Sequence, residues 1–558
     1  MARVANSRIR LLLLCIVLTF GALLAREAWL ATVRASALSS MAQSQTKTPV
    51  VLPAGRGTIF DELGTPLALG EQATTVYADP HQVRNPTREA VAAARVLGIK
   101  PVPIYSALTQ RSLAFVYIER KALHDKAAKL AKLNLPGFHF YAEEKRVYPQ
   151  GAVAAPVLGY AGVDNVGLAG LELGLNKQLT GIPGKETIVR DPFGTPIEIQ
   201  STTPAKQGRD VFLTLDHVIQ ANAEQVLRET VHKWGAKDAT AIVLDPKTGG
   251  VLAMATEPGY NANSYPTAPS ALLTNHAVSD VFEPGSVFKV VTIAGALSEH
   301  LVTPRTAFTL PYSIRVADRV IHDAERRGTQ RMTVAQILQR SSNVGAVTIA
   351  TKLLGETRLK KWIRQFGFGQ DTGIDLPGET PGILPPYWSG STIGNVPIGQ
   401  GISVTAIQLA SVYAAIANGG TWVQPHLVDH VQGERQAALT RRRIVSPRVD
   451  RQLLTMLRGV VSDAGTGAAA EIPGYTVAGK TGTAQKPGPH GYEAGRYVAT
   501  FVGMVPASDP RLVVLVTVDE PHRAIFGGVV AAPAFAQIAA FDLQYLEVQP
   551  DLPVTPAR

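Results

Sequence analysis

Three short motifs in the second half of the sequence combine hydroxyl groups with a lysine or an amide. They are Ser286-Val-Phe-Lys289, Ser341-Ser-Asn343 and Lys480-Thr-Gly-Thr483, in this order along the chain. A serine hydroxyl is a weak nucleophile and needs a base beside it. Lysine can be that base only when burial or a nearby cation lowers its pKa and makes it neutral. The first motif therefore contains the components of an activated serine nucleophile.

The surroundings of the first motif predict a buried helix. Glu283-Pro-Gly285 is a turn that can start a helix, and the stretch Val290–Leu297 is apolar almost all round. On a helix, the i,i+3 spacing places the serine and the lysine on one face. The helix start also offers backbone N–H groups that can hold an oxyanion. The motif is weak by itself, because Ser44-Gln-Thr-Lys47 matches it by chance in a polar segment.

The second motif falls in a polar break between two helix-like segments. A loop at Ser341-Ser-Asn343 could present a hydroxyl and a carboxamide into a cleft, although serine and asparagine are also common in ordinary turns. It is the only Ser-x-Asn sequence in the chain. Its position relative to the other two motifs is therefore more informative than its composition.

The third motif follows the strand-like segment Tyr475–Ala478. Gly482 lets a substrate backbone approach the strand closely, Lys480 can hold a carboxylate, and Thr483 can offer a backbone N–H to an oxyanion. The same letters occur at Lys247-Thr-Gly249, where glycine fits a hairpin turn. That copy precedes the Ser-x-x-Lys motif, so we expect it to have no catalytic role.

The elements that must position these motifs form a pattern of strands, then helices, then strands. Asp216 can cap a helix from His217 to Lys233, and Ala241–Leu244 and Val251–Met254 read as a hairpin. Strands at both ends of one segment predict a single sheet packed on a helical layer. Helices are expected at 286–299, 333–340, 344–354, 404–418 and 449–461, and strands at 474–485, 497–504 and 512–519.

The chain before this segment contains both helix-like and strand-like stretches. Arg209–Leu215 alternates as a strand does, which places a domain boundary near residues 210–220, and Arg88–Leu97 is an Ala-rich helix candidate. Residues 34–54 are small and polar and are typical of a linker. We therefore expect a separate domain of about 150 residues upstream of the motifs.

The N-terminus predicts a membrane anchor. Three arginines at positions 3, 8 and 10 precede the apolar run Leu11–Ala25, which partly resumes after Arg26-Glu27. Fifteen residues are short for a span of about 20, and a cleaved signal peptide is the alternative. No small-x-small cleavage site follows the run, which favours an uncleaved anchor. The positive-inside rule then places residues 1–10 in the cytoplasm.

Composition excludes several classes of protein. The chain has 558 residues, 46% of them hydrophobic and 18% charged, which excludes a wholly disordered protein. The single cysteine, Cys15, excludes an intramolecular disulfide and a cysteine-based zinc site. None of the 12 histidines falls into a paired metal-binding spacing. His322-Asp323 has the letters of a His/Asp pair but no evident serine partner, and we expect it to form a surface turn.

The order of the three motifs is that of the serine penicillin-interactive enzymes. The chain resembles a class B penicillin-binding protein, a peptidoglycan D,D-transpeptidase, from the anchor to about residue 545, and it is more similar to the division-specific (FtsI-like) subgroup than to the elongation subgroup. The segments that carry the resemblance are Arg56-Gly-Thr-Ile-Phe-Asp61, Arg146-Val-Tyr-Pro149, Gly167–Glu172, Asp245–Gly249, Gly399–Thr405 and Gly527-Gly528.

The resemblance implies an α/β (α+β) architecture. A single N-terminal transmembrane helix would precede a mixed α/β pedestal and a transpeptidase domain with a central antiparallel sheet flanked by helices, the serine β-lactamase-like fold. Arg56 and Glu172 would form a structural salt bridge. The expected parts are a cytoplasmic tail (1–10), the anchor (11–33), a linker (34–55), the pedestal (56–215), the transpeptidase domain (216–546) and a C-terminal tail (547–558).

The resemblance also implies a catalytic role for each motif. Ser286 would attack the D-Ala-D-Ala carbonyl of a stem peptide, and Lys289 would accept its proton. Ser341 would relay a proton to the leaving D-alanine with electrostatic support from Lys480, and Asn343 would hold the amide on the acyl side. No metal and no organic cofactor would be required.

The third motif would bind the end of the substrate. Thr481 and Thr483, beside Gly482, would hold the terminal carboxylate, which a β-lactam also presents. The backbone N–H groups of Ser286 and Thr483 would form the oxyanion hole. An amine of a neighbouring stem peptide would then attack the acyl-enzyme and complete the crosslink.

The implied partners are stem peptides, β-lactam antibiotics, a SEDS-family glycan polymerase and other division proteins at the septum of the inner membrane. No motif supports nucleic-acid binding. The Glu-x-x-Leu-Asn sequence of class A β-lactamases does not occur after the Ser-x-x-Lys motif, and the match at Glu172–Asn176 lies upstream of all three motifs. An elongation-type transpeptidase, a D,D-carboxypeptidase and a penicillin-binding sensor stay open as alternatives.

Overall fold

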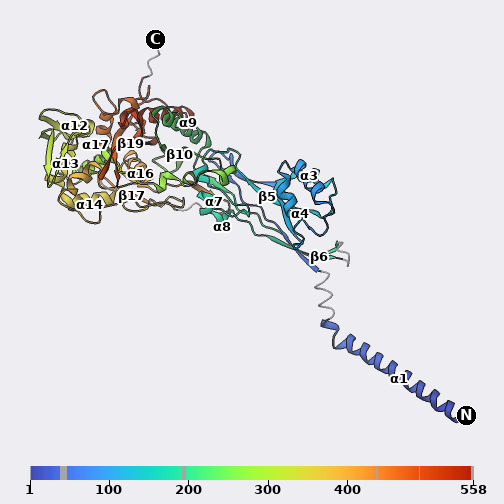
Figure 1. The fold of residues 1–558 in the computed structure, drawn as a ribbon. Coiled ribbons are helices and arrows are strands. Elements are labelled where there is room, and N and C mark those ends of the chain that lie inside the picture. Colours follow the sequence, from blue (N-terminus) through green and yellow to red (C-terminus); the bar gives the residue numbers. More distant parts are fainter. Residues whose placement is uncertain (1, 38–46, 191–195, 435–437, 489–490, 554–558) are drawn as a thin grey trace. The chain divides into compact units, whose positions relative to one another are not determined.

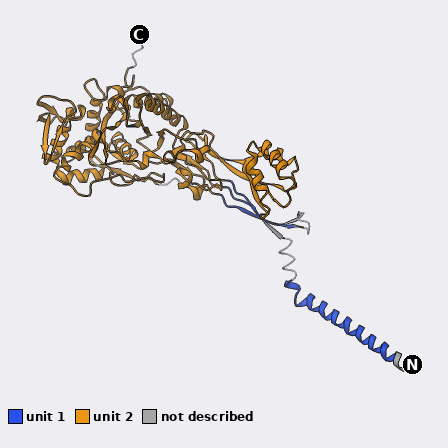
Figure 2. Cartoon of the chain, viewed as in Figure 1, with its two compact units in different colours: residues 1–55, 181–207 blue, residues 56–180, 208–558 orange. Residues whose placement is uncertain are grey.

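The computed structural model describes residues 2–37, 47–190, 196–434, 438–488 and 491–553 (Figure 1). The chain divides into two compact units (Figure 2). One contains residues 1–55 and 181–207, and the other contains residues 56–180 and 208–558. The chance motif at Ser44 lies outside the described residues.

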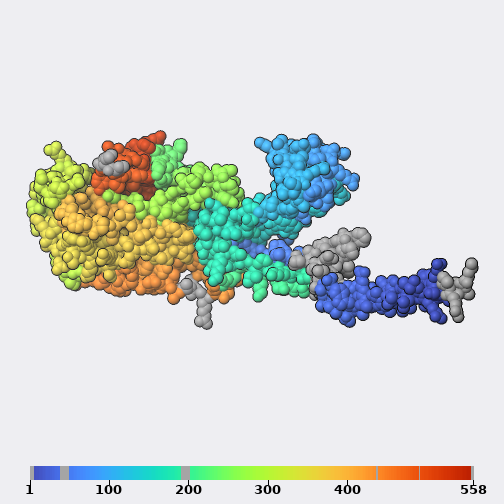
Figure 3. All heavy atoms as spheres, turned by 60° about the horizontal axis from the view of Figure 1, so that its bottom comes forward, coloured from blue at the N-terminus to red at the C-terminus, as the bar shows by residue number. Residues whose placement is uncertain are grey.

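The first unit contains one long helix and a small sheet. Helix α1 (Ala2–Thr32) continues without a break through Arg26 and Glu27, and the side chains of residues 6–29 are exposed (Figure 3). Residues 6–32 are long and apolar enough to cross a membrane, and at about 1.5 Å per residue they exceed the roughly 30 Å hydrocarbon core. The sheet is antiparallel, in the order β1 (Lys47–Leu52), β6 (Gly184–Arg190) and β7 (Pro196–Thr203).

The N-terminal part of the second unit is built on a six-stranded sheet. Its strand order is β16-β8-β2-β3-β4, and β5 also pairs with β3. Helices α3, α4 and α5 enclose a separate apolar core with β3, β4 and β5, and the helix expected at 88–97 is confirmed as α3. The bounds are β2 (Ile59–Phe60), β3 (Pro66–Ala78), α3 (Pro86–Leu97), α4 (Pro101–Leu108), β4 (Val116–Leu123), α5 (His124–Ala131), β5 (Phe138–Val147), α6 (Ala155–Leu158), α7 (Gly170–Gly174), α8 (Asn176–Leu179), β8 (Val211–Leu213) and β16 (Val428–Val431).

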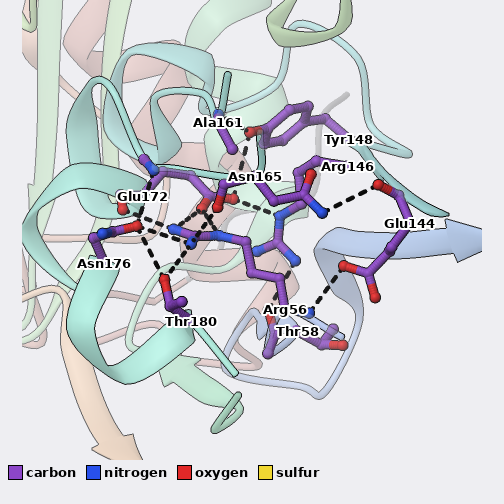
Figure 4. Close-up of polar contacts among 12 residues, drawn as sticks. Arg56, Thr58, Glu144, Arg146, Tyr148, Ala161, Asn165, Glu172, Asn176 and Thr180 are labelled. Carbon is purple, nitrogen blue, oxygen red and sulfur yellow. Dashed lines mark hydrogen bonds and ion pairs between the residues drawn. The ribbon is translucent and has the colours of Figure 1, made fainter. Parts of the chain in front are cut away.

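A buried ionic network joins the segments around this sheet (Figure 4). Arg56 Nε lies 2.6 Å from one carboxylate oxygen of Glu172, and Arg146 Nε lies 2.6 Å from the other. Tyr148 OH approaches the same carboxylate at 3.4 Å. All four side chains are buried. The expected salt bridge between Arg56 and Glu172 is therefore present, with Arg146 as a second cation.

Replacing Glu172 is expected to destabilise the chain strongly. The variant Glu172→Ala leaves Arg56 and Arg146 buried without their counter-charge, and breaking a buried pair in this way costs about 3–5 kcal/mol. The control is Glu356→Ala, which removes an exposed pair with Lys360 worth less than about 1 kcal/mol. Urea unfolding of the full chain compares the two variants, and equal stability would mean that the network contributes little.

The C-terminal part of the second unit contains the predicted central sheet. It is antiparallel, in the order β10-β9-β20-β19-β18, so strands from both ends of the segment form one sheet as expected. The third motif lies on the edge strand β18, which starts at Ala478 rather than at residue 474, because Ile472–Tyr475 form a turn. The bounds are β9 (Asp238–Leu244), β10 (Val251–Glu257), β18 (Ala478–Gly488), β19 (Gly491–Val505) and β20 (Leu512–Asp519).

Helices cover both faces of this sheet. Helix α9 (His217–Trp234), capped by Asp216 as predicted, packs with α19 (Ala532–Tyr545) on one face. Helices α11 (Lys289–Ser298) and α16 (Ala406–Ala417) belong to the core on the other face. The predicted helices at 333–340, 344–354 and 449–461 are confirmed.

The remaining described α-helices and strands of this C-terminal part occur along the chain from α10 to α18. The helices are α10 (His276–Ser279), α12 (Val334–Gln339), α13 (Asn343–Ile349), α14 (Gly355–Gln365), α15 (Thr392–Asn395), α17 (Pro447–Val460) and α18 (Gly527–Val530). The strands form three pairs: β11 (Ala307–Leu310) with β14 (Gln330–Thr333), β12 (Ser313–Val316) with β13 (Arg319–His322), and β15 (Thr421–Val423) with β17 (Arg441–Arg443).

Candidate active site

Ser286 lies on a short 3-10 turn, η3 (Gly285–Phe288), that leads directly into α11. Gly285 has a left-handed φ of +57°, and a Cβ there would lie 2.9 Å from the carbonyl oxygen of Thr483. A side chain at this position is therefore disfavoured by both conformation and space. This close approach brings the backbone at Ser286 next to that of Thr483.

The three motifs meet through their side chains. Lys289 Nζ lies 2.9 Å from Ser286 Oγ and 3.0 Å from Ser341 Oγ, and it donates to the carbonyl oxygen of Ser341 at 2.5 Å. Lys480 Nζ donates to Ser341 Oγ at 2.9 Å. Serine, lysine, serine and lysine therefore form one continuous chain of contacts. Lys247, from the second copy of the third motif, instead pairs with Asp509 on an exposed turn.

Burial changes the protonation of both lysines, whose side chains are fully enclosed. Burial lowers the pKa of Lys289 well below its usual value, and the charge of Lys480 lowers it further, while Asp323 has the opposite effect. Burial lowers the pKa of Lys480 to about 7. Both shifts therefore favour the neutral form of the amine, which Lys289 needs in order to act as a base.

The contacts of Lys289 suit a neutral amine. Such a group has two N–H donors and one lone pair. The carbonyl oxygen and the Oγ of Ser341 can accept both N–H groups. The lone pair is then left for the hydroxyl of Ser286, which is the geometry that a general base requires.

Asn343 begins α13 beside this chain of contacts. Its Nδ2 donates to the carbonyl oxygen of His322 at 3.0 Å. Ser342 Oγ caps the same helix by accepting from the N–H of Gly345 at 3.0 Å. The side chain of Asn343 is partly exposed, so its carboxamide is oriented by the His322 carbonyl while remaining accessible.

The threonines of the third motif contact two loops. No motif in the sequence pointed to the loop at Thr466, and none related the loop at Gly527 to these threonines. Thr481 Oγ1 lies 2.6 Å from Thr466 Oγ1, and Thr483 Oγ1 accepts from the N–H of Gly527 at 3.2 Å. A Cβ at Gly528 would lie 2.2 Å from the carbonyl oxygen of Thr466. The glycines on either side of Thr466 were the only available signal for its loop.

The prediction of a surface turn at His322-Asp323 is wrong for Asp323. His322 is exposed, but Asp323 is buried and accepts a hydrogen bond from Ser342 Oγ at 3.0 Å. The serine partner comes from the second catalytic motif, 19 residues further along the chain. Sequence spacing alone did not indicate this pairing.

Two family descriptions match the chain. Residues 239–540 match "Penicillin binding protein transpeptidase domain", and residues 51–213 match "Penicillin-binding Protein dimerisation domain". Together these matches include all three motifs and most of the segment upstream of them.

Curated relatives are similar over almost the whole chain. "Peptidoglycan D,D-transpeptidase FtsI" of Escherichia coli is 33% identical over 98% of this chain and 92% of its own length. "Stage V sporulation protein D" of Bacillus subtilis is 35% identical over 98% of this chain and 88% of its own length.

Solved structures share the fold. A peptidoglycan synthetase from Bifidobacterium adolescentis superposes with a TM-score of 0.73 at 29% identity, over 92% of this chain and 99% of the other. Penicillin binding protein 3 from Mycobacterium tuberculosis, complexed with aztreonam, gives 0.70 at 31% identity, over 91% and 99%.

Proposed function

Because the chain belongs to the penicillin-binding protein transpeptidase family and carries the family's dimerisation domain, we propose that this peptidoglycan D,D-transpeptidase is of the division-specific type and crosslinks stem peptides during septal wall synthesis. The observation that carries the catalytic part is the chain of contacts Ser286–Lys289–Ser341–Lys480. The division role is supported by the FtsI relative and by the FtsI-like segments of the sequence.

In the proposed reaction, Ser286 Oγ attacks the carbonyl carbon of the D-Ala-D-Ala bond and Lys289 takes its proton. The tetrahedral intermediate collapses as its C–N bond breaks; Ser341 Oγ passes its proton to the leaving D-alanine and takes the proton held by Lys289, 3.0 Å away. Lys480, 2.9 Å from Ser341 Oγ, supports this transfer electrostatically. An amine of a second stem peptide then attacks the acyl carbon and loses a proton to Lys289. The ester bond to Ser286 Oγ breaks, and Lys289 returns the proton to Ser286.

The oxyanion of the intermediate is proposed to accept hydrogen bonds from the backbone N–H groups of Ser286 and Thr483. The close approach of the Gly285 backbone to the carbonyl oxygen of Thr483 supports this assignment, because it brings the backbones of Ser286 and Thr483 close together. A donor of this kind contributes about 3–4 kcal/mol in other acyl-transfer enzymes. Asn343 is proposed to hold the amide on the acyl side of the bond.

The terminal carboxylate is proposed to bind at Thr481 and Thr483. Lys480 Nζ lies 3.4 Å from Thr481 Oγ1, and Thr466 Oγ1 contacts the same atom. If both groups donate to this oxygen, the hydroxyl proton of Thr481 is free to point to the substrate. Thr466 then positions a hydroxyl that contacts the carboxylate.

Replacing Thr466 is expected to weaken the acylation of carboxylate-bearing β-lactams. The variant Thr466→Val keeps the shape but removes the donor, and one lost hydrogen bond of this kind costs about 1 kcal/mol, or about fivefold in rate. Thr466→Ser keeps the hydroxyl and should react at nearly the normal rate. Acylation kinetics with fluorescent penicillin test this, and a valine variant as fast as the serine variant would refute it.

We propose that α1 anchors the chain in the membrane, with residues 1–10 in the cytoplasm and the bulk of the chain on the other side. We propose the division into pedestal (56–215) and transpeptidase domain (216–546), and a contact of the anchor and pedestal with a SEDS-family polymerase and other division proteins. Chemical crosslinking of this chain in its own cells, followed by identification of the proteins captured with it, tests that contact.

Two experiments test the function. A stem-peptide mimic supplied with and without an amine acceptor should give the crosslinked product when the amine is present, whereas hydrolysis alone would indicate a D,D-carboxypeptidase. In its own cells, a fluorescent fusion should gather at the septum, and depletion should produce filaments. Rounded cells on depletion would instead indicate an elongation-type enzyme, and an unchanged shape would favour a sensor.

A further inference from the structure

Asp323 is a buried carboxylate at the centre of a polar cluster directly behind the second motif. Both of its oxygens lie 3.0 Å from Ser342 Oγ, and Oδ1 also accepts from the N–H of Val344 at 2.9 Å. Oδ2 accepts from Arg327 Nε at 2.9 Å. Residue 323 is 6% exposed and residue 342 is 2% exposed, so these bonds are made away from water and are expensive to break.

Backbone carbonyl groups of the segment before β13 hold Arg327 and Asp323 in place. Arg327 Nη1 donates to the carbonyl oxygen of Leu310 at 2.9 Å, and the N–H of Asp323 donates to that of Tyr312 at 3.2 Å. The neighbouring carbonyl, that of His322, orients the carboxamide of Asn343. The last residue of β13 therefore contacts Asn343, and the loop that follows β13 contacts Ser342.

Ser341 has an unusual backbone conformation. Its φ is +57°, the left-handed region that residues other than glycine rarely adopt. In this conformation its carbonyl oxygen and its Oγ both reach Lys289. A strained residue persists only where the surrounding structure fixes it, and the residue that follows it, Ser342, is the one that Asp323 holds.

We propose that Asp323 is a positioning residue for catalysis, which clamps Ser342 and the start of α13 so that Ser341 keeps the left-handed backbone that delivers its two oxygen atoms to Lys289. This inference rests on the proposed function, because it assigns Asp323 to the same acylation reaction. Asp323 contacts neither the reacting atoms nor the place proposed for the substrate, so it acts through Ser341 and Asn343.

Asp323 also acts on Lys289 through its charge. The charged groups that influence Lys289 are Lys480 from β18, which lowers the pKa of Lys289, and Asp323 from the loop after β13, which raises it. Acylation requires neutral Lys289, so the rate rises with pH through the pKa of this lysine. Removing the Asp323 charge lowers that pKa, and the acid limb of the profile must then move to lower pH.

The test uses the full chain and the acylation rate with fluorescent penicillin from pH 5 to pH 10. In Asp323→Asn, which keeps the shape and removes the charge, we expect the rate at neutral pH to fall about 10- to 100-fold, the order of one lost hydrogen bond to a charged group. The acid limb should move to lower pH. The matched control is Asp318→Asn, an exposed carboxylate of the same segment, which should change neither quantity.

A second variant separates position from charge. Ser342→Ala removes the hydroxyl that Asp323 accepts from but keeps the charge, so we expect a lower rate with the acid limb unmoved. It also keeps the proposal testable if the Asp323 variant does not fold. An unchanged rate in either folded variant, or a rate loss in Asp323→Asn with an unmoved acid limb, would overturn the proposal. Failure of the wild-type chain to be acylated would instead refute the proposed function itself.

Discussion

A chain carrying Ser286→Ala is expected to form no covalent adduct with penicillin while keeping its fold. The substitution removes one oxygen atom from a partly exposed side chain, and α11 and its apolar core are left intact. Ser341 Oγ also contacts Lys289, but it accepts hydrogen bonds from both Lys289 and Lys480. In the variant, therefore, no described hydroxyl is placed to lose its proton to Lys289 as Ser286 does.

Labelling with a fluorescent penicillin, read after denaturing electrophoresis, measures this loss, and thermal unfolding checks the fold. Ser264→Ala, on an exposed turn, is the matched control and should label normally. Labelling of the Ser286 variant at the normal rate would mean that another residue is the nucleophile and that the proposed roles are wrong.

Lys289→Ala is expected to have the second largest effect, with acylation slowed by about 10²- to 10⁴-fold, the usual contribution of a general base. The serine remains, but no described amine other than that of Lys289 lies within hydrogen-bonding distance of Ser286 Oγ. The loss should therefore appear in the rate of acylation while penicillin still binds reversibly.

The pH dependence gives an independent check. Burial lowers the pKa of Lys289. The wild-type acylation rate should therefore rise with pH and reach its plateau at a pH well below the pKa of an ordinary lysine. The plateau should be lost in the Lys289 variant. Lys247→Ala, in the exposed copy of the third motif, should leave both rate and profile unchanged, and near-normal acylation of Lys289→Ala would require another base.

Local patterns in the sequence predicted much of the catalytic part of the fold. Strand β20 matches the predicted 512–519, α9 begins after its Asp216 cap, and the β9–β10 hairpin lies around its predicted turn. These features depend on residues close together in the chain. The order of the three motifs also predicted which side chains meet, because that order is shared across the family.

Contacts between distant residues were not predictable in this way. Strand β16 pairs with β8, more than 200 residues earlier, and Thr466 reaches Thr481 from a separate loop. Asp323 is charged and follows a short strand, so the sequence indicates a surface turn. Its burial is explained by partners brought to it by the fold, Ser342, Val344 and Arg327. Helix α1 passes through Arg26-Glu27, and both side chains are exposed on it.

The central claim is that Ser286 forms the acyl-enzyme, and peptide mapping by mass spectrometry of the penicillin-treated full chain tests it most directly. We predict the mass of one penicilloyl group on the peptide that contains Ser286 and on no other peptide. An adduct on the peptide that contains Ser341 or Ser44, or no adduct at all, would contradict the account.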